Sequence, residues 1–168
     1  IEDGTVFRLS ATEFRLCCAD RQIDWLMDCA IGYDLVITEV TDAIVGLAVQ
    51  GPVSCKILKK TGFDGVEKLK IFQLESFSLN GYEVMVSRTG FTGDLGYELW
   101  TNAINAADLW ETLFKAGKPH GIRMIGSEAL DMLRIEAGLI MVDVEFMSCF
   151  HTVKYDRNRT PFELGLDW

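Results

Sequence analysis

Residues 72–88 read FQLESFSLNGYEVMVSR, and this stretch decides the class of fold. Two runs rich in apolar, β-branched and aromatic residues flank Asn80-Gly81, the dipeptide most typical of a tight hairpin turn. Farther out, residues 4–9 and 13–19 predict another hairpin, and residues 35–40 and 44–49 predict two more strands. Strands that come in hairpins indicate antiparallel sheets rather than a doubly wound parallel sheet.

Helices are predicted between the pairs of strands. Apolar residues at helical spacing predict helices over 20–31, 53–60, 105–116 and 127–137, with Asp20 and Ser127 as N-caps. Gly62 and Gly138 are predicted to end the second and fourth of these helices, and Trp110 is expected on the apolar side of the third. The fold class is therefore α+β: antiparallel sheets of hairpins with flanking helices, arranged as two small ferredoxin-like lobes. A soft boundary near residues 62–72 divides the chain into lobes 1–66, with the order β-β-α-β-β-α, and 67–168. The tail from Leu139 on is predicted to be irregular.

Composition excludes several classes of function. The 168 residues carry a net charge of −9, and 49% of them are hydrophobic. The longest apolar run, 43–49, is far below the roughly 18 residues that a membrane span needs. Acidity without a Lys/Arg cluster disfavours nucleic acid, since phosphate binding needs concentrated positive charge. The chain starts at Ile1 and shows no signal peptide, so we expect a piece of a longer cytoplasmic protein.

The five cysteines include no C-x-x-C pair, which indicates reduced thiols rather than a disulfide framework. The two histidines, His120 and His151, have no partners at metal-ligand spacing, so we predict no metal site. A nucleophilic pair of Cys149 and His151 remains an alternative interpretation. Structural thiols are the favoured interpretation, because nothing nearby in the sequence would activate a cysteine.

Residues 87–99, SRTGFTGDLGYEL, form a glycine-rich turn between two strands. The spacing of Gly90, Gly93 and Gly96 matches neither the dinucleotide fingerprint nor the P-loop, and a strand follows instead of a helix. Glu98 projects from this strand on the side opposite its neighbours. Its carboxylate either faces solvent or accepts paired N–H donors from a planar heterocycle.

Residues 131–139, DMLRIEAGL, belong to the last predicted helix. Leu130, Leu133 and Ala137 are predicted to form its buried stripe, with Arg134 at the border of that stripe. Spacing alone favours a surface pair of Arg134 with Asp131, three residues earlier. The alternative is an arginine that faces an anionic or carbonyl-bearing ligand.

Four segments together resemble the glycine cleavage T-protein family, which comprises tetrahydrofolate-dependent aminomethyl- and methyltransferases and folate-dependent demethylases. They occur in the family's order and span nearly the whole chain: LAVQGP at 47–52, residues 87–99, residues 128–139, and PFELGL at 161–166. The family's amino-terminal portion and its carboxy-terminal barrel have no counterpart here. The resemblance implies a central fragment of a one-carbon transferase that uses tetrahydrofolate.

The resemblance also implies a set of site residues. Asp3 falls on the family's catalytic aspartate, and Phe7 on an aromatic that borders the folate. Glu98 falls on the glutamate that binds the pterin ring, Phe91 on the aromatic of the glycine turn, and Arg134 on the arginine of the last helix. With the resemblance added, Glu98 and Arg134 are both expected to be ligand residues. Asp3 would orient the folate N5 nitrogen by a hydrogen bond.

Two departures from the family bear on the substrate. Residues 17–19, CCA, replace a typical Val-Val-Asn, and residues 141–143, MVD, replace Leu-Tyr-Gly. The expected partners are folate and either a lipoyl carrier protein or a small one-carbon donor such as a methylated amine, sulfur compound or aryl ether. Two alternatives remain: a folate-binding regulatory module without catalysis, and the folate domain of a larger amine dehydrogenase or demethylase.

Overall fold

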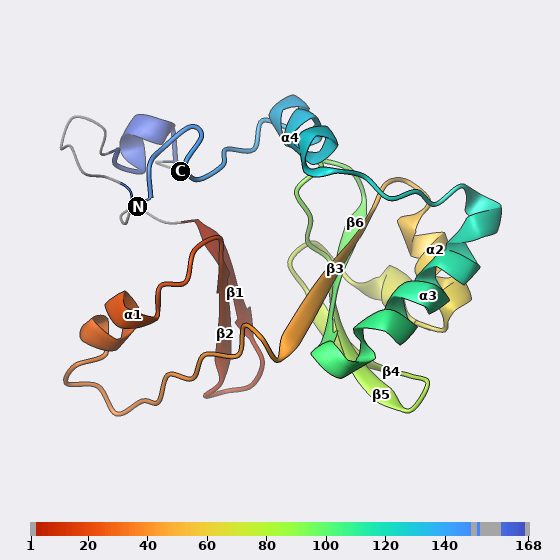
Figure 1. Cartoon of the computed structure of the whole chain (residues 1–168), viewed down its shortest axis with the longest axis horizontal. Helices are drawn as coiled ribbons and strands as arrows, with labels where there is room; N and C mark the ends of the chain where they lie inside the picture. The colour runs from red at the N-terminus through yellow and green to blue at the C-terminus, as the bar shows by residue number, and fades with distance from the viewer. Residues whose placement is uncertain (1–2, 149–150, 152–158, 167–168) are drawn as a thin grey trace. The chain divides into compact units, whose positions relative to one another are not determined.

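The computed structural model describes residues 3–148, 151 and 159–166. The chain divides into two compact units: a first unit of Ile1–Glu39 with Ile140–Trp168, and a second unit of Val40–Leu139 (Figure 1). Residues 62–72, where the sequence predicts a soft boundary, lie inside the second unit. The reason is that strand β3 (Ile44–Gln50), which precedes them, pairs with strand β6 (Gly96–Asn102), which follows them.

The second unit is built on a four-stranded antiparallel sheet in the order β3-β6-β5-β4. Its strands are β3 (Ile44–Gln50), β4 (Leu74–Leu79), β5 (Tyr82–Ser87) and β6 (Gly96–Asn102). Asn80 and Gly81 both have positive φ, 49° and 89°, as a two-residue hairpin turn of this sequence requires. The α+β class with antiparallel hairpins is confirmed.

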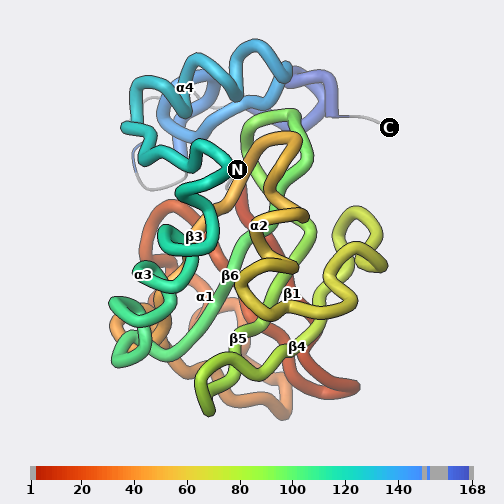
Figure 2. Tube along the Cα trace, turned by 90° about the vertical axis from the view of Figure 1, so that its right-hand side faces the viewer, coloured from red at the N-terminus to blue at the C-terminus, as the bar shows by residue number. Residues whose placement is uncertain are grey.

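Two helices, α2 (Ser54–Thr61) and α3 (Ala106–Gly117), cover one face of this sheet, as Figure 2 shows from the helix side. The core between them is formed by side chains with little or no exposed surface, among them Val49, Leu58, Val84, Val86, Tyr97, Leu99, Leu109 and Leu113. Gly62 ends α2 in the left-handed conformation, as predicted. Trp110, which we expected in the stripe of α3, is 41% exposed and packs against Phe114.

The opposite face of the sheet carries the residues of functional interest, and we call it the outer face. Because side chains alternate along a strand, Gly96, Glu98 and Trp100 of β6 point away from the core formed by Tyr97 and Leu99. The register places Ala48 of β3 and Ser87 of β5 on either side of Glu98.

Helix α4 (Ser127–Glu136) follows the predicted bounds, and Gly138 ends it with φ +75°. Two expectations about α4 were wrong. Gly126, not Ser127, is its N-cap residue, and Arg134 is its buried residue in place of the predicted stripe. Leu130 and Leu133 are half-buried and Ala137 is exposed, whereas Arg134 is 1% exposed and is paired with Asp131.

The first unit contains the predicted hairpin of β1 (Gly4–Arg8) and β2 (Phe14–Cys18), followed by α1 (Ile23–Cys29). Gln22 precedes α1, so Asp20 is not its N-cap, and α1 buries none of its residues. Residues 35–40 form no strand, since β-propensity without a pairing partner does not make one. The later part of the unit contains a short 3₁₀ helix, η5 (Phe162–Leu164). No helix in the described ranges could cross a membrane.

Candidate functional site

Gln50, at the end of β3, holds the glycine turn (residues 89–96) in place. Its amide nitrogen donates to the backbone oxygens of Thr89 and Tyr97, at 3.3 and 3.2 Å, and its amide oxygen accepts from the Thr92 hydroxyl at 3.2 Å. A Cβ at Gly90 or Gly96 would overlap this amide. The two glycines are therefore required by the close approach of the Gln50 side chain and not by a bound phosphate.

Glu98 lies beside this turn, half-buried on the outer face. The Thr89 hydroxyl donates a short hydrogen bond to its Oε2 atom. Thr89 in turn contacts the Ser87 hydroxyl at 2.7 Å, and the Trp100 indole lies 3.3 Å from the same serine oxygen. The carboxylate is thus held by side chains of the glycine turn and of two strands.

A flat floor of small residues borders Glu98. Ala48 pairs with Glu98 across the β3–β6 ladder, and Gly46 pairs with Trp100. A Cβ at Gly46 would lie 2.8 Å from Cζ3 of the Trp100 ring, so the indole lies over the glycine backbone. The indole therefore covers Gly46, and Ala48, beside Glu98, is the small residue on which a planar ring can lie.

Arg134 is anchored within α4 and its C-terminal loop. Nε and Nη2 of its guanidinium each lie 2.7 Å from Oδ1 of Asp131, and Nε donates a hydrogen bond to that oxygen. Nη1 donates to the Leu139 carbonyl at 3.2 Å. The side chain is 1% exposed. The pair that spacing predicted is present, but Arg134 is buried rather than solvated.

The glycine turn connects the three predicted site residues of the second unit. Phe91 lies within the turn and is half-buried, while Glu98 is hydrogen-bonded to Thr89 of the turn. A Cβ at Gly93 would meet Ala137, so the C-terminal end of α4, the helix of Arg134, packs against the same turn (Figure 1). The turn that contains Phe91 and binds Glu98 thus also contacts the end of the helix that carries Arg134.

Asp3 and Phe7 belong to the first unit. Asp3 is exposed and directly precedes β1, while Phe7 is a buried residue of β1, 3% exposed, paired with Arg15 of β2. Their predicted catalytic and folate-bordering roles stay predictions.

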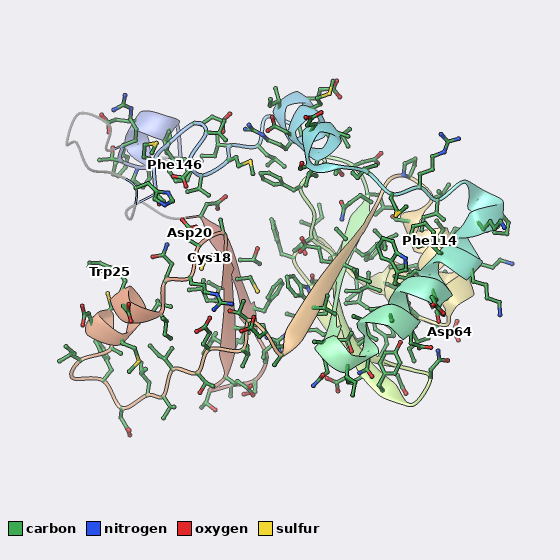
Figure 3. The ribbon with its side chains drawn as sticks, viewed as in Figure 1. Cys18, Asp20, Trp25, Asp64, Phe114 and Phe146 are labelled. Atoms are coloured by element: carbon green, nitrogen blue, oxygen red, sulfur yellow. The ribbon has the colours of Figure 1, made fainter. Side chains whose placement is uncertain are left out.

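One further cluster of ionisable groups lies in the first unit, where Asp20 follows β2 (Figure 3). His151 Nδ1 lies 2.6 Å from Oδ2 of Asp143 and 4.0 Å from Oδ2 of Asp20. A backbone hydrogen bond from Ser148 lowers the pKa of Asp143, and the bond with His151 adds to that effect. Three such groups are able to hold a cation, yet His151 and Asp143 already satisfy each other as a pair. Cys149, offered above as a partner of His151, lies outside the described residues.

Sequence reasoning missed the residues that hold Glu98. The sequence predicts no functional role for Gln50, which lies in the LAVQGP segment. It also predicts none for Ser87, Thr89 and Trp100, which it places only in a strand or a turn. One signal was present: Glu98 and Trp100 are two apart on a strand, so they share a face. The partners from β5 and β3 become visible only once the register of the sheet is known.

Comparison with known proteins gives the family. A family model described as the GCVT N-terminal domain matches residues 1–168. The chain belongs to the GCVT N-terminal domain family. Among solved structures, the glycine cleavage system aminomethyltransferase T of Bartonella henselae matches this GCVT domain with a TM-score of 0.70 and 29% identity, over 84% of this chain and 38% of that one. The resemblance inferred from the four sequence segments is confirmed.

Two curated relatives of this GCVT domain have different names. The trimethylamine-oxide aldolase of Ruegeria pomeroyi is 37% identical over 177 residues, which cover 99% of this chain and 21% of that protein. An aminomethyltransferase of Clostridium botulinum strain Okra is 34% identical over 171 residues, 99% of this chain and 44% of that protein. The chain spans less than half the length of either relative.

Proposed function

We propose that this GCVT domain binds tetrahydrofolate and serves in the transfer of an aminomethyl or methyl group. The observation that carries the proposal is the placement of Glu98: a carboxylate held at Oε2 on the outer face, next to Ala48 and to the Trp100 indole that covers Gly46. The family membership and the aminomethyltransferase relatives support the same class of transferase.

The residues of the second unit suit a reduced pterin. Pterin presents N–H donors at one edge, and a carboxylate accepts such donors in pairs. Glu98 would bind that edge, while Phe91 and the small residues of β3 would border the ring faces. Arg134 is assigned to the same ligand by the family resemblance, and Asp131 fixes the position from which its guanidinium would approach.

The family resemblance assigns two further site residues, Asp3 and Phe7, which belong to the first unit. Bound folate would supply the N5 nitrogen that accepts the one-carbon group. Asp3 would accept a hydrogen bond that orients N5 and would favour the positive charge that develops near the transferred carbon. Phe7 would cover the ring. For this role Asp3 needs only to remain a carboxylate, and it is not required to act as a strong base.

Calorimetry with tetrahydrofolate on the complete protein tests the assignment of Glu98. We expect Glu98→Ala to weaken binding by about 2–3 kcal/mol, the scale for loss of a charged hydrogen-bond partner. Glu111→Ala, at an exposed position of α3 on the helix side of the sheet, is the matched control and should leave binding unchanged. If Glu98→Ala and the unmodified protein bind tetrahydrofolate with equal affinity, the assignment of Glu98 as a folate ligand is wrong.

A second experiment separates a transferase from a binding module. Asp3→Asn should lower turnover strongly and leave the affinity for folate nearly unchanged, since the amide keeps the size but not the charge. A protein that binds folate but has no turnover with any donor before mutation would be a regulatory module.

The identity of the one-carbon donor is the most specific part of the proposal, and the two relatives support different donors. An aminomethyl group on a lipoyl carrier protein suits the aminomethyltransferase relatives. The trimethylamine-oxide aldolase relative, together with the departures at residues 17–19 and 141–143, favours a methylated amine. Parallel assays of the complete protein with both donors decide between them.

A further inference from the structure

Behind Glu98, on the outer face of the sheet, lies a chain of three side chains that ends on its carboxylate. We call this series of hydrogen bonds the relay; it runs from Trp100 of β6 through Ser87, the last residue of β5, to Thr89 of the glycine turn. Ser87 has no exposed surface, so its hydroxyl must be satisfied inside the protein. The second unit alone contains every member of the chain.

The chemistry of the two ends fixes the direction of every hydrogen bond in between. An indole N–H is a donor only, and a carboxylate is an acceptor only. Trp100 therefore donates to the Ser87 oxygen, and Thr89 donates to Oε2 of Glu98. Because the Thr89 hydrogen is used in that bond, the 2.7 Å contact with Ser87 is one in which Ser87 donates.

A competing acceptor does not change this assignment. The Ser87 hydroxyl also lies 3.4 Å from the backbone oxygen of Glu98. That separation is at the limit of a hydrogen bond between oxygens, whereas 2.7 Å is their preferred distance. The Ser87 hydrogen therefore points to Thr89, and each bond in the sequence polarises the next.

We propose that Trp100, Ser87 and Thr89 are positioning residues that hold Glu98 as a hydrogen-bond acceptor and so select ligands with N–H donors at this point. Oε2 accepts the Thr89 hydrogen and is held in place by that bond. Oε1, which receives no hydrogen bond from a described residue, remains for the ligand. This inference rests on the proposed folate function and adds the hydrogen bonds that orient Glu98 as an acceptor.

The test compares two threonines of the same turn in the complete protein. Thr89→Val keeps the shape of the side chain and removes the donor to Glu98. Thr92→Val makes the same chemical change on the Gln50 side of the turn, outside the relay. We expect Thr89→Val to weaken tetrahydrofolate binding about fivefold to twentyfold by calorimetry, Thr92→Val less than twofold, and Thr89→Ser to restore affinity, because its hydroxyl is retained.

A ligand-free readout tests the relay on its own. Ser87→Ala removes the acceptor of the Trp100 indole, so the Nε1–H resonance, assigned by loss in Trp100→Phe, should shift in the NMR spectrum and exchange faster with solvent. An unchanged resonance in Ser87→Ala would overturn the relay.

The outcomes separate the relay from the proposed function. If the unmodified protein does not bind tetrahydrofolate, the proposed function is refuted. The Trp100 Nε1–H resonance in Ser87→Ala still tests the hydrogen bonds in that case. If Glu98→Ala loses affinity but Thr89→Val does not, the folate site stands and the positioning role is refuted. Equal losses in Thr89→Val and Thr92→Val would also refute it, since they would indicate only a loosened turn.

Discussion

The amide of Gln50 occupies the space that a Cβ at Gly96 would need. The three atoms nearest to that Cβ all belong to the Gln50 side chain, and Gly96 does not have a positive φ. The glycine is thus required by one neighbour and not by its own backbone conformation. Because Gln50 also binds Thr89 and Tyr97, this relationship links the end of β3 to the turn beside Glu98.

Gly96→Ala should destabilise the protein by about 1–3 kcal/mol, the usual cost of overpacking. The new methyl group has to displace the Gln50 amide and break its hydrogen bonds. In a Gln50→Ala background the added cost of Gly96→Ala should largely disappear, as a double-mutant cycle measured by denaturant unfolding will show. Additive effects would contradict the contact.

Gly46→Ala tests the floor beside Glu98. Its Cβ would come within 2.8 Å of the Trp100 ring, which therefore has to move. We expect a loss of about 1–3 kcal/mol in unfolding free energy and a shift of the Trp100 fluorescence, identified by comparison with Trp100→Phe. Unchanged stability and emission would show that the indole does not lie over Gly46.

Asp131→Ala should cost about 1–3 kcal/mol of stability, because it removes the carboxylate that accepts from Nε of the buried Arg134 guanidinium. Asp131 is itself 47% exposed at its side chain, so most of the loss comes from the arginine. Asp131→Asn should be intermediate, since the amide oxygen still accepts. Glu128→Ala, exposed on the first turn of the same helix, is the comparison variant. Thermal unfolding that does not distinguish Asp131→Ala from Glu128→Ala would argue against the anchor.

Asp108 provides a prediction on pH. Its Oδ2 accepts hydrogen bonds from Asn80 and Tyr82, each 2.8 Å long, and these bonds lower the pKa of Asp108 below 3.8. A carboxyl with a lowered pKa in the folded state contributes stability above its unfolded pKa, and that contribution is lost as the pH falls. Desolvation, followed by the bond to Asp108, raises the pKa of Tyr82 to about 12, so the tyrosine remains a donor at neutral pH.

The melting temperature of Asp108→Asn should therefore lie below that of the unmodified protein at pH 6–8, and the difference should shrink as the pH falls below about 4. The matched control is Asp64→Asn, at an exposed position labelled in Figure 3. A difference that stays constant from pH 7 to pH 3 would show that the charge of Asp108 does not matter.

Local signals in the sequence were sufficient for part of the fold. The Asn80-Gly81 hairpin, the end of α2 at Gly62 and the end of α4 at Gly138 formed as predicted, because each depends on a backbone conformation that a few adjacent residues fix. The predicted strand over 35–40 failed for the opposite reason. A strand needs a partner, and no local pattern supplies one.

The family, too, could be read from the sequence, because its segments are long and keep their order. The setting of Glu98 could not. Its position on the face opposite Tyr97 follows from alternation along β6, but its partners come from residues 9 and 11 positions away and from Trp100 on its own strand. Only the pairing of β5 and β3 with β6 brings Ser87, Ala48 and Gly46 beside it. Local pattern and family resemblance were enough to single out Glu98 as the candidate carboxylate. How that carboxylate is held was decided only by the tertiary structure, because register and side-chain burial arise only when distant strands pair.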